Sequence, residues 1–211
     1  VGLPLREAIF QDKPDVFNFT NDLPTIYITA GKQGSHVINE AVKEILPQLL
    51  ESYNVIHQCG SHSQYDDFSE LQKMEKELPA ELQKRYVLRD YVYQDEVGCA
   101  FSRANIVISR AGAHTIYEII ALAKPAVLIP IPWVSHNEQL KNALVITEKE
   151  AGVLLEQKDL SGANLLSSVQ TIQNDYQQYT DNAAQNKELV RFNATELMME
   201  EIRKMIKETD N

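Results

Sequence analysis

Two glycine-containing turns and one glutamate in this chain have the residue types and spacing of a nucleotide-binding site. The turns are Ala-Gly-Lys-Gln-Gly-Ser at residues 30–35 and Ser-Arg-Ala-Gly-Ala at residues 109–113. Small residues there could expose backbone N–H groups to an anion, and Gly112 could either take a positive φ or let a ligand come close. Glu118 follows about one helical turn later. Its carboxylate could accept the hydroxyls of a ribose or could simply favour the first turn of a helix.

The elements that would position these turns are predicted from the hydrophobic pattern. The β-branched runs 25–29 and 106–108 predict buried strands before the turns. Apolar residues at helical spacing predict helices after them, from residue 37 onward and over 115–122. With a further strand at 126–129, the second turn belongs to a βαβ unit. In open α/β sheets, anions and nucleotides bind where such turns follow the strands. The first turn has neither a Walker A pattern nor a complete Gly-x-Gly-x-x-Gly, so alone it does not identify a ligand.

The whole chain is predicted to be one α/β domain with a Rossmann-like, doubly wound parallel sheet. We expect about six mostly parallel strands with helices on both faces. The remaining strands are expected near residues 54–60, 86–93 and 151–155, and residues 162–211 have helical spacing only. His57, on one of these strands, is predicted to be a core histidine rather than a ligand.

Composition restricts the possible partners and compartment. The chain carries 20 basic and 30 acidic residues, a net charge of −10, which argues against binding to nucleic acid. Its two cysteines, Cys59 and Cys99, lie in apolar surroundings and are predicted to be reduced core residues of a cytosolic protein. No apolar run approaches the roughly 18 residues that span a bilayer. No set of His, Cys, Asp and Glu residues has metal-ligand spacing, so no metal is predicted.

One known family resembles this sequence over nearly its whole length. The residues that carry the resemblance are Ser109–Ala113, Thr115, Glu118, Pro125, Ile129–Pro130, Gln139 and Asn142–Ala143. They resemble the donor-site signature of family 28 glycosyltransferases, and most closely that of the MurG-like members, which add N-acetylglucosamine to a lipid-linked muramyl-pentapeptide. The resemblance implies the C-terminal half of a two-domain GT-B glycosyltransferase.

The first glycine turn is similar to the Gly-Gly-Ser-x-Gly-Ala loop that faces the donor diphosphate in this family. The residues that fit are Gly31, Gln33 and Gly34, and those that depart are Ala30, Lys32 and Ser35. Lys32 could replace a hydroxyl contact with a charge, which suits a diphosphate, or could point into solvent. The departures leave open which UDP-sugar is the donor.

The first residues of the chain resemble the segment that ends the N-terminal domain in this family. Residues 2–6, Gly-Leu-Pro-Leu-Arg, are similar to Gly-Asn-Pro-Val-Arg, with Leu3 in place of the Asn. We therefore expect residues 1–24 to be an interdomain linker and connector, residues 25–211 to be the UDP-sugar donor-binding domain, and an N-terminal acceptor domain to be absent. Arg6 is expected at the donor diphosphate or, alternatively, as a solvated linker charge.

The resemblance also implies a role for each part of the site. Tyr91 and Val92 would flank the uracil base, and Glu118 would bind the ribose. Both glycine turns, with Arg6, would meet the diphosphate. The sugar would lie at the next helix, where Glu138 stands in place of a family Gln. The full expected UDP-sugar-binding set is Arg6, Gly31, Lys32, Gln33, Gly34, Ser35, Tyr91, Val92, Arg110, Gly112, Ala113, His114, Thr115, Glu118, Glu138, Gln139 and Asn142.

The activity implied by the resemblance is transfer of N-acetylglucosamine from UDP-N-acetylglucosamine to a lipid-linked muramyl-pentapeptide in peptidoglycan synthesis, with inversion at the anomeric carbon. No cofactor is expected. The catalytic base, the acceptor site and any membrane contact would belong to the missing N-terminal domain, so the isolated domain is expected to be inactive. The full-length enzyme would be cytoplasmic and peripheral on the inner face of the plasma membrane.

Other functions remain open on the sequence alone. A family 28 transferase of glycolipid or exopolysaccharide synthesis would keep the fold and use another UDP-sugar. A catalytic subunit that recruits a membrane-anchored partner is disfavoured by residues 2–6, because such subunits begin near the first strand. A nucleotide-sugar-binding module without chemistry belongs to another class, as does a sugar-nucleotide epimerase. An epimerase could use Glu118 and His114, although their spacing fits a transferase better.

Overall fold

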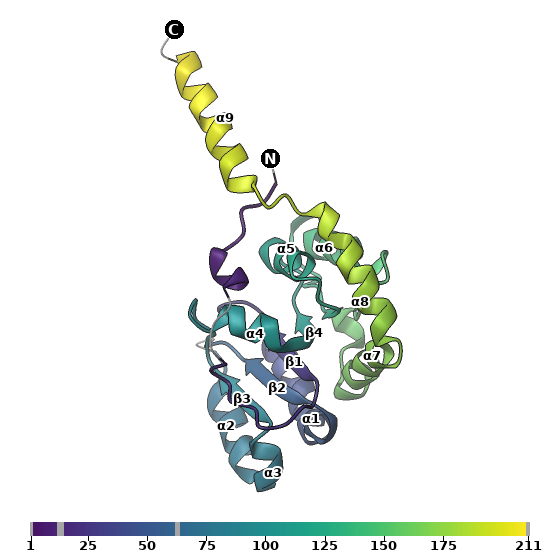
Figure 1. Ribbon diagram of the computed structural model, residues 1–211. Coiled ribbons are helices and arrows are strands. Elements are labelled where there is room, and N and C mark those ends of the chain that lie inside the picture. The colour runs from purple at the N-terminus through teal and green to yellow at the C-terminus, as the bar shows by residue number, and fades with distance from the viewer. Residues whose placement is uncertain (1, 12–14, 62–63, 210–211) are drawn as a thin grey trace.

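A six-stranded, fully parallel β-sheet lies at the centre of the structure (Figure 1). This computed structural model describes residues 2–11, 15–61 and 64–209. The strand order is β3-β2-β1-β4-β5-β6, the order of a doubly wound Rossmann-like sheet, so the predicted fold is confirmed. The strands are β1 Thr25–Thr29, β2 Asn54–Gln58, β3 Tyr86–Arg89, β4 Ala104–Ser109, β5 Ala126–Leu128 and β6 Gly152–Leu154.

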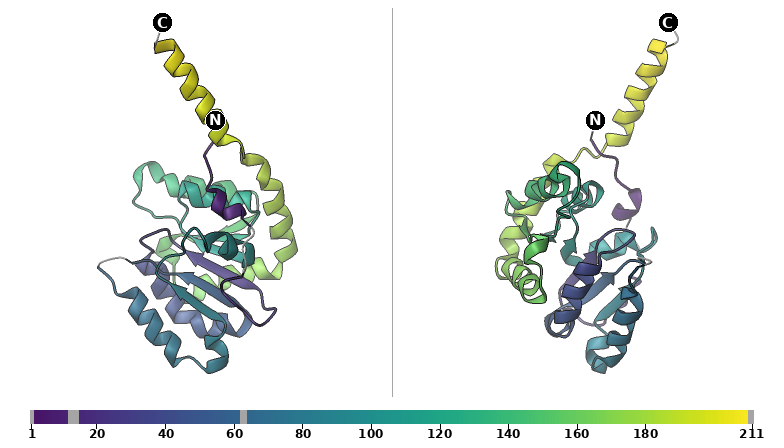
Figure 2. Two further views of the ribbon diagram at one scale, coloured as in Figure 1. Left: turned by 60° about the vertical axis from the view of Figure 1, so that its left-hand side comes forward. Right: turned by 180° about the vertical axis from the view of Figure 1, so that it is seen from behind.

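Helices cover both faces of the sheet (Figures 1 and 2). Side chains of α1, α2 and α7 pack on one face, and side chains of α4, α5 and α6 pack on the other. The α-helices are α1 His36–Ser52, α2 Asp67–Glu77, α3 Ala80–Gln83, α4 Val97–Arg103, α5 Ala113–Ala121, α6 Glu138–Thr147, α7 Gly162–Asn174, α8 Tyr176–Gln185 and α9 Ala194–Thr209. Short 3-10 helices are η1 Glu7–Phe10, η2 Ser135–Asn137, η3 Gln157–Asp159 and η4 Asn186–Leu189.

The central strands supply side chains to two separate cores. In β1, Tyr27 points into the core beneath α4 and α5, whereas Ile26 and Ile28 point into the core beneath α1 and α7. All residues of β1 are buried, as expected for a parallel strand that is covered on both faces. Each fully buried isoleucine contributes about 2 kcal/mol of hydrophobic stabilisation. The turns that follow β1 and β4 therefore start from firmly held strand ends.

The segment before β1 packs against the helical layer around α4. Ile9 of η1 is buried in the same core as Phe17 and Phe19, which lie in the irregular stretch that follows. The expected connector thus contributes three buried side chains to the domain. This packing also fixes the position of Arg6, immediately before η1, beside the carboxyl end of β1.

The last helix, α9, extends away from the sheet and its covering helices (Figures 1 and 2). Helical spacing predicted helices over residues 162–211, and α9 is one of the helices that the structure contains there. The apolar side chains Met198, Met199, Ile202, Met205 and Ile206 are exposed along it. Within the described part of the chain, no helix combines the length and the apolar character required to cross a membrane.

The cysteines occupy the positions expected from their apolar surroundings. Cys59 and Cys99 are both free and buried, as predicted. Burial raises the pKa of the Cys59 thiol to about 12, with a further contribution from the charge of Asp67, and burial also raises the pKa of Cys99. Both thiols are therefore protonated at neutral pH, as is usual for packing residues.

His57 is a core histidine, as its strand position predicted, with 0% of its surface exposed. Its Nε2 donates to the side-chain oxygen of Asn39 at 3.0 Å, and its Nδ1 accepts from the Tyr86 hydroxyl at 2.9 Å. Burial lowers the pKa of His57 to about 3, outweighing the charge of Asp67, which raises it. The imidazole is therefore neutral in the folded chain and joins β2 to α1 and β3.

This burial predicts a pH dependence of stability. The unfolded chain takes up a proton at His57 below its ordinary pKa of 6.5, whereas the folded chain does not until about 3. Stability from this site is therefore complete above pH 6.5 and is lost as the pH falls toward 3, by about 2 kcal/mol between pH 7 and pH 5.

Urea denaturation at several pH values measures this effect. The decrease in unfolding free energy between pH 7 and pH 5 should be about 2 kcal/mol smaller in His57→Asn than in the natural chain. His136→Asn is the matched control, because His136 is exposed and its replacement should leave the loss unchanged. An unchanged loss in His57→Asn would contradict the account.

Candidate functional site

The two glycine turns meet at the point where the sheet changes direction. β1 and β4 are neighbours, but the helix after β1 packs on one face of the sheet and the helix after β4 packs on the other. The connections therefore diverge and leave a crevice beyond the carboxyl ends of these two strands. In open α/β sheets this is the usual place for a ligand.

The first turn, residues 30–35, depends on two glycines in the left-handed region. Gly31 has a φ of +77° and Gly34 a φ of +71°, and the Gly34 N–H donates to the Gly31 carbonyl at 3.1 Å. A Cβ on Gly34 would overlap the carbonyl oxygen of Cys59, because the turn lies directly against the end of β2. A Cβ on Gly31 would meet nothing, so that side of the turn is open to a ligand.

The second turn ends at the N-terminus of α5. Gly112 is the N-cap with a φ of −65°, so the first of the two alternatives for this glycine, a positive φ, does not apply. No atom lies within 4 Å of a Cβ built on Gly112, and this open space supports the alternative, close approach of a ligand. The N–H groups of Ala113, His114 and Thr115 precede the first helical bond, which Ile116 donates to Gly112. They and the helix dipole favour an anion at this end.

A cavity of about 130 Å³ lies beside these turns and contains seven of the predicted site residues. Glu118 is buried on α5, and its Oε1 accepts from Arg6 Nε at 2.7 Å. Burial alone would lower the pKa of Arg6, but the hydrogen bond and charge of Glu118 outweigh it and raise that pKa. Arg6 therefore lies at the predicted ribose carboxylate in this structure. The seven residues are Arg6, Gly31, Lys32, Tyr91, Val92, Thr115 and Glu118.

Gln58, at the end of β2, is a site residue that sequence analysis missed. It is buried, lines the same cavity, and donates from Nε2 to the Gly31 carbonyl at 2.7 Å. Its Oε1 accepts from the Val92 backbone N–H at 3.1 Å. One amide thus joins the first glycine turn to the predicted base-binding segment. Its signal in the sequence is its place at the end of a predicted strand, next to His57.

A second cavity, of about 360 Å³, continues from the first. Gly31 and Thr115 line both cavities, so the two form one groove that passes between the glycine turns. Its far wall includes Trp133, which is 73% exposed and which sequence analysis did not assign to the site. The predicted site residues that line this second cavity are Gly31, Gly34, Ser35, Arg110, Gly112, Thr115 and Gln139.

Arg110 provides a positive charge at the groove. It is 8% exposed, and it donates to the Ile129 carbonyl at 3.0 Å and to the Ser35 hydroxyl at 2.8 Å. Burial lowers the pKa of Arg110 to about 10, so it remains charged at neutral pH. No carboxylate in the described residues pairs with it, and its Nε has no hydrogen-bond partner there. An unpaired buried guanidinium at the edge of a groove suits an anionic ligand.

Five predicted residues do not line either cavity. Asn142 donates to the Ala111 carbonyl at 3.1 Å and so supports the second turn from α6. Gln139 does line the second cavity, and its Oε1 accepts from the Ile131 N–H at 3.1 Å. Glu138, one residue earlier on α6, is exposed. The five residues outside both cavities are Gln33, Ala113, His114, Glu138 and Asn142.

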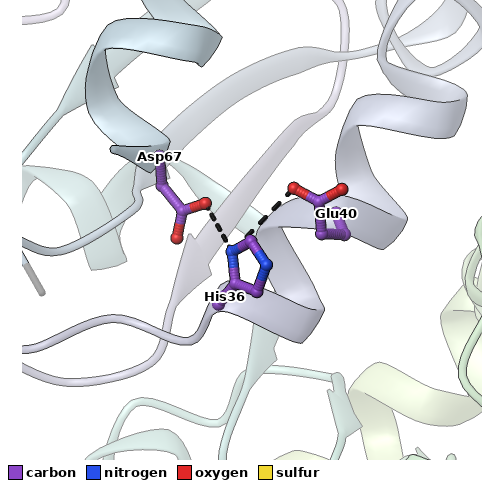
Figure 3. A group of neighbouring side chains, drawn as sticks. All are labelled: His36, Glu40 and Asp67. Atoms are coloured by element: carbon purple, nitrogen blue, oxygen red, sulfur yellow. Dashed lines mark hydrogen bonds and ion pairs between the residues drawn. The ribbon is translucent and has the colours of Figure 1, made fainter. Parts of the chain in front are cut away.

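The structure also brings together His36, Glu40 and Asp67, whose ligand atoms all lie within 4.8 Å of one another (Figure 3). Sequence analysis found no such set, because Asp67 comes from a different helix. Both carboxylates already have donors: Lys43 pairs with Glu40, and the Asn39 amide donates to Asp67 at 2.7 Å. We therefore interpret the three residues as a hydrogen-bonded group rather than as a metal centre.

Comparison with known proteins relates this arrangement to glycosyltransferases. Residues 25–199 match the model of a protein family described as "Glycosyltransferase family 28 C-terminal domain". The chain is 32% identical over 186 residues to the UDP-N-acetylglucosamine--N-acetylmuramyl-(pentapeptide) pyrophosphoryl-undecaprenol N-acetylglucosamine transferase of Lachnospira eligens, an alignment that covers 86% of this chain and 49% of that protein. The protein of the same name from Syntrophus aciditrophicus is 33% identical over 172 residues, which cover 80% of this chain and 45% of that protein.

A solved structure has the same fold. The crystal structure of Acinetobacter baumannii MurG superimposes with a TM-score of 0.70 at 24% identity, covering 94% of this chain and 52% of that one. The chain thus spans about half the length of the curated relatives that it matches.

Alanine substitution is predicted to destabilise the chain by different amounts at the two glycines Gly34 and Gly112. Gly34→Ala should cost more than about 2 kcal/mol of unfolding free energy, because a left-handed φ and overlap with Cys59 add. Gly112→Ala should cost less than about 1 kcal/mol, because φ is ordinary and the space is open. Urea denaturation measures both. Equal losses for the two variants would mean that the turns are not shaped as described.

Proposed function

The chain belongs to glycosyltransferase family 28, and on this premise we propose that residues 25–211 bind the UDP-sugar donor of a glycosyl transfer. The observation that carries the proposal is the single groove at the switch point of the sheet, which passes between the first glycine turn and the N-terminus of α5. An extended nucleotide sugar has a base and ribose, a diphosphate and a sugar in series. A groove of two cavities joined at an anion-binding centre matches that order.

The uridine end of the donor is assigned to the smaller cavity. Tyr91 and Val92 line it and offer an aromatic and an aliphatic surface to a base. Glu118 is buried there with Oε1 bonded to Arg6, which leaves Oε2 for a ribose hydroxyl. Because the same cavity includes Gly31, Arg6 is near enough to the first turn to contact the donor as well.

The diphosphate is assigned to the junction between the cavities. Backbone N–H groups of the first turn and of residues 113–115 would donate to its oxygens, and Arg110 and Lys32 would supply positive charge. When the bond from the anomeric carbon to the phosphate oxygen breaks, negative charge grows on the departing UDP. Donors fixed around that position stabilise the transition state more than the bound donor, which is the requirement for catalysis.

The sugar end is assigned to the larger cavity, where Gln139 can exchange hydrogen bonds with sugar hydroxyls. Glu138 and Asn142 lie on the same helix and would support or extend this contact. The names of the relatives support UDP-N-acetylglucosamine as the donor and a lipid-linked muramyl-pentapeptide as the acceptor, hence a role in peptidoglycan synthesis. Because the chain spans about half their length, acceptor binding and contact with the cytoplasmic face of the plasma membrane would belong to the rest of a full-length enzyme.

Calorimetric titration of the chain with UDP-N-acetylglucosamine, UDP-glucose, UDP-galactose and UDP tests the proposal. We expect the N-acetylglucosamine donor to bind most tightly. Glu118→Ala should weaken that binding by roughly 10- to 100-fold, because a charge-assisted hydrogen bond to the ribose is lost.

Glu148→Ala is the matched control, since Glu148 is exposed near the other end of α6 and should leave the affinity unchanged. Equal binding of all UDP-sugars would keep the site and change the assigned donor. Unaltered affinity in Glu118→Ala would remove the ribose assignment.

A further inference from the structure

An exposed tryptophan lines the larger cavity and has no role in the subsites assigned so far. Trp133 is the single tryptophan of the chain, and 73% of its surface is exposed. Its ring stacks on no other aromatic ring within the described residues. Leaving so large an apolar ring in water forgoes the free energy that its burial would release. An aromatic ring exposed on the wall of a groove is therefore a candidate contact for a ligand.

The loop that carries Trp133 is held in place on both sides of the ring. It runs from the end of β5 to η2, and Pro130 and Pro132 restrict its backbone because each fixes its own φ. The side chain of Gln139, in the first turn of α6, accepts from the Ile131 N–H at 3.1 Å. The indole ring and this amide thus belong to one structural unit at the wall of the cavity.

The two side chains of this unit complement the two kinds of surface that a pyranose sugar offers. The Oε1 of Gln139 is engaged by the loop, and no hydrogen bond of its Nε2 occurs among the described residues, so its two N–H groups can donate to sugar hydroxyls. A sugar with equatorial hydroxyls, such as N-acetylglucosamine, carries C–H bonds on the faces of its ring. These weakly positive hydrogens are attracted to the negative face of an aromatic ring. An amide donor beside an indole therefore fits a hexopyranose.

The order of the strands places Trp133 at the sugar end of the groove. At the carboxyl edge of the sheet, Tyr91 follows β3, the two glycine turns follow β1 and β4, and Trp133 follows β5. Tyr91 lines only the smaller cavity, and Trp133 lines only the larger one. A donor with its base beside Tyr91 and its diphosphate at the junction of the cavities would thus extend its sugar toward Trp133.

The other aromatic rings of the larger cavity are already engaged by neighbouring side chains. His36, at the start of α1, stacks on Tyr65 with a centroid distance of 3.8 Å and an interplanar angle of 6°. Its Nδ1 also lies 2.7 Å from Oδ1 of Asp67 (Figure 3). One face of each of these two rings is therefore covered by the other ring, whereas the Trp133 ring has no such partner among the described residues. The contact with the sugar is accordingly assigned to Trp133.

We propose that the sugar ring of the donor stacks on Trp133, so that this residue determines how much the sugar adds to the affinity of UDP. The inference rests on the proposed donor site and names the chemical class of its sugar, a hexopyranose with a C–H face. Trp133 contacts the sugar and takes part in no proton transfer. The competing explanation is that Trp133 contacts another part of a full-length enzyme, in which case a UDP-sugar would leave the ring as exposed as UDP does.

Fluorescence of the natural chain tests the contact directly, because selective excitation of indole reports on Trp133 alone. Quenching of this emission by acrylamide measures how accessible the ring is. Saturating UDP-N-acetylglucosamine should lower the quenching constant roughly twofold, because a stacked sugar covers one of the two faces of the indole. Saturating UDP, which lacks the sugar, should leave the quenching constant unchanged. Equal quenching with the two ligands would overturn the inference.

Substitution of Trp133 tests the same contact by calorimetry. Trp133→Ala should weaken the binding of UDP-N-acetylglucosamine roughly tenfold and leave the affinity for UDP within about twofold, because only the sugar loses a partner. Trp133→Phe, which keeps an aromatic face, should bind the UDP-sugar within about threefold of the natural chain. Phe192→Ala is the matched control, because Phe192 is an aromatic residue that is 61% exposed and lines neither cavity. Both affinities should be unchanged in that variant.

The possible results separate this inference from the proposed function. In Trp133→Ala, an equal loss of affinity for UDP and for the UDP-sugar, or no loss for either, would overturn the inference and leave the proposed donor site in place. Thermal unfolding identifies a variant that fails to fold, and then the quenching of the natural chain decides. If the natural chain binds neither UDP nor a UDP-sugar in calorimetry, the proposed function fails, and the inference fails with it.

Discussion

The close approach of two backbones, at Gly34 and Gly60, is the constraint on which the rest of the site depends. Both glycines have left-handed φ values, and a Cβ on either would overlap the main chain of the other turn. This contact holds the start of α1 against the end of β2. Gln58 can then bond to the Gly31 carbonyl, and Asn39 can bond to the Cys59 carbonyl. The open side of the first turn and the network around Asp67 both follow from that contact.

The charge distribution complements this backbone arrangement. The chain as a whole has a net charge of −10, yet the groove contains the exposed Lys32, the N-terminus of α5 and Arg110, which pairs with no carboxylate among the described residues. The one buried carboxylate in the smaller cavity, Glu118, is held by Arg6. The overall negative charge disfavours polyanions such as nucleic acid, whereas a local concentration of donors favours a small diphosphate.

The features that could be predicted from the sequence are those that a local pattern of residues determines. β1 was predicted at its observed bounds, and the turns, the core role of His57 and the α5 position of Glu118 all follow from residue type and short-range spacing. The sequence did not predict pairings between distant residues: Arg6 with Glu118 is 112 positions apart, and His36 with Asp67 is 31 apart. For Gly112 the sequence left two explanations open, a positive φ or the close approach of a ligand, because both give glycine the same local signal.

The central claim is that the groove between the turns binds a nucleotide diphosphate. The most direct test is an NMR titration of the ¹⁵N-labelled chain with UDP. The account predicts that the largest amide shifts occur in residues 31–35 and 113–115, and that the Arg110 Nε–H, which has no hydrogen-bond partner in the described residues, becomes protected from exchange. Shifts that leave both turns unchanged, or that cluster instead around the separate cavity at Pro130 and Lys158, would contradict it.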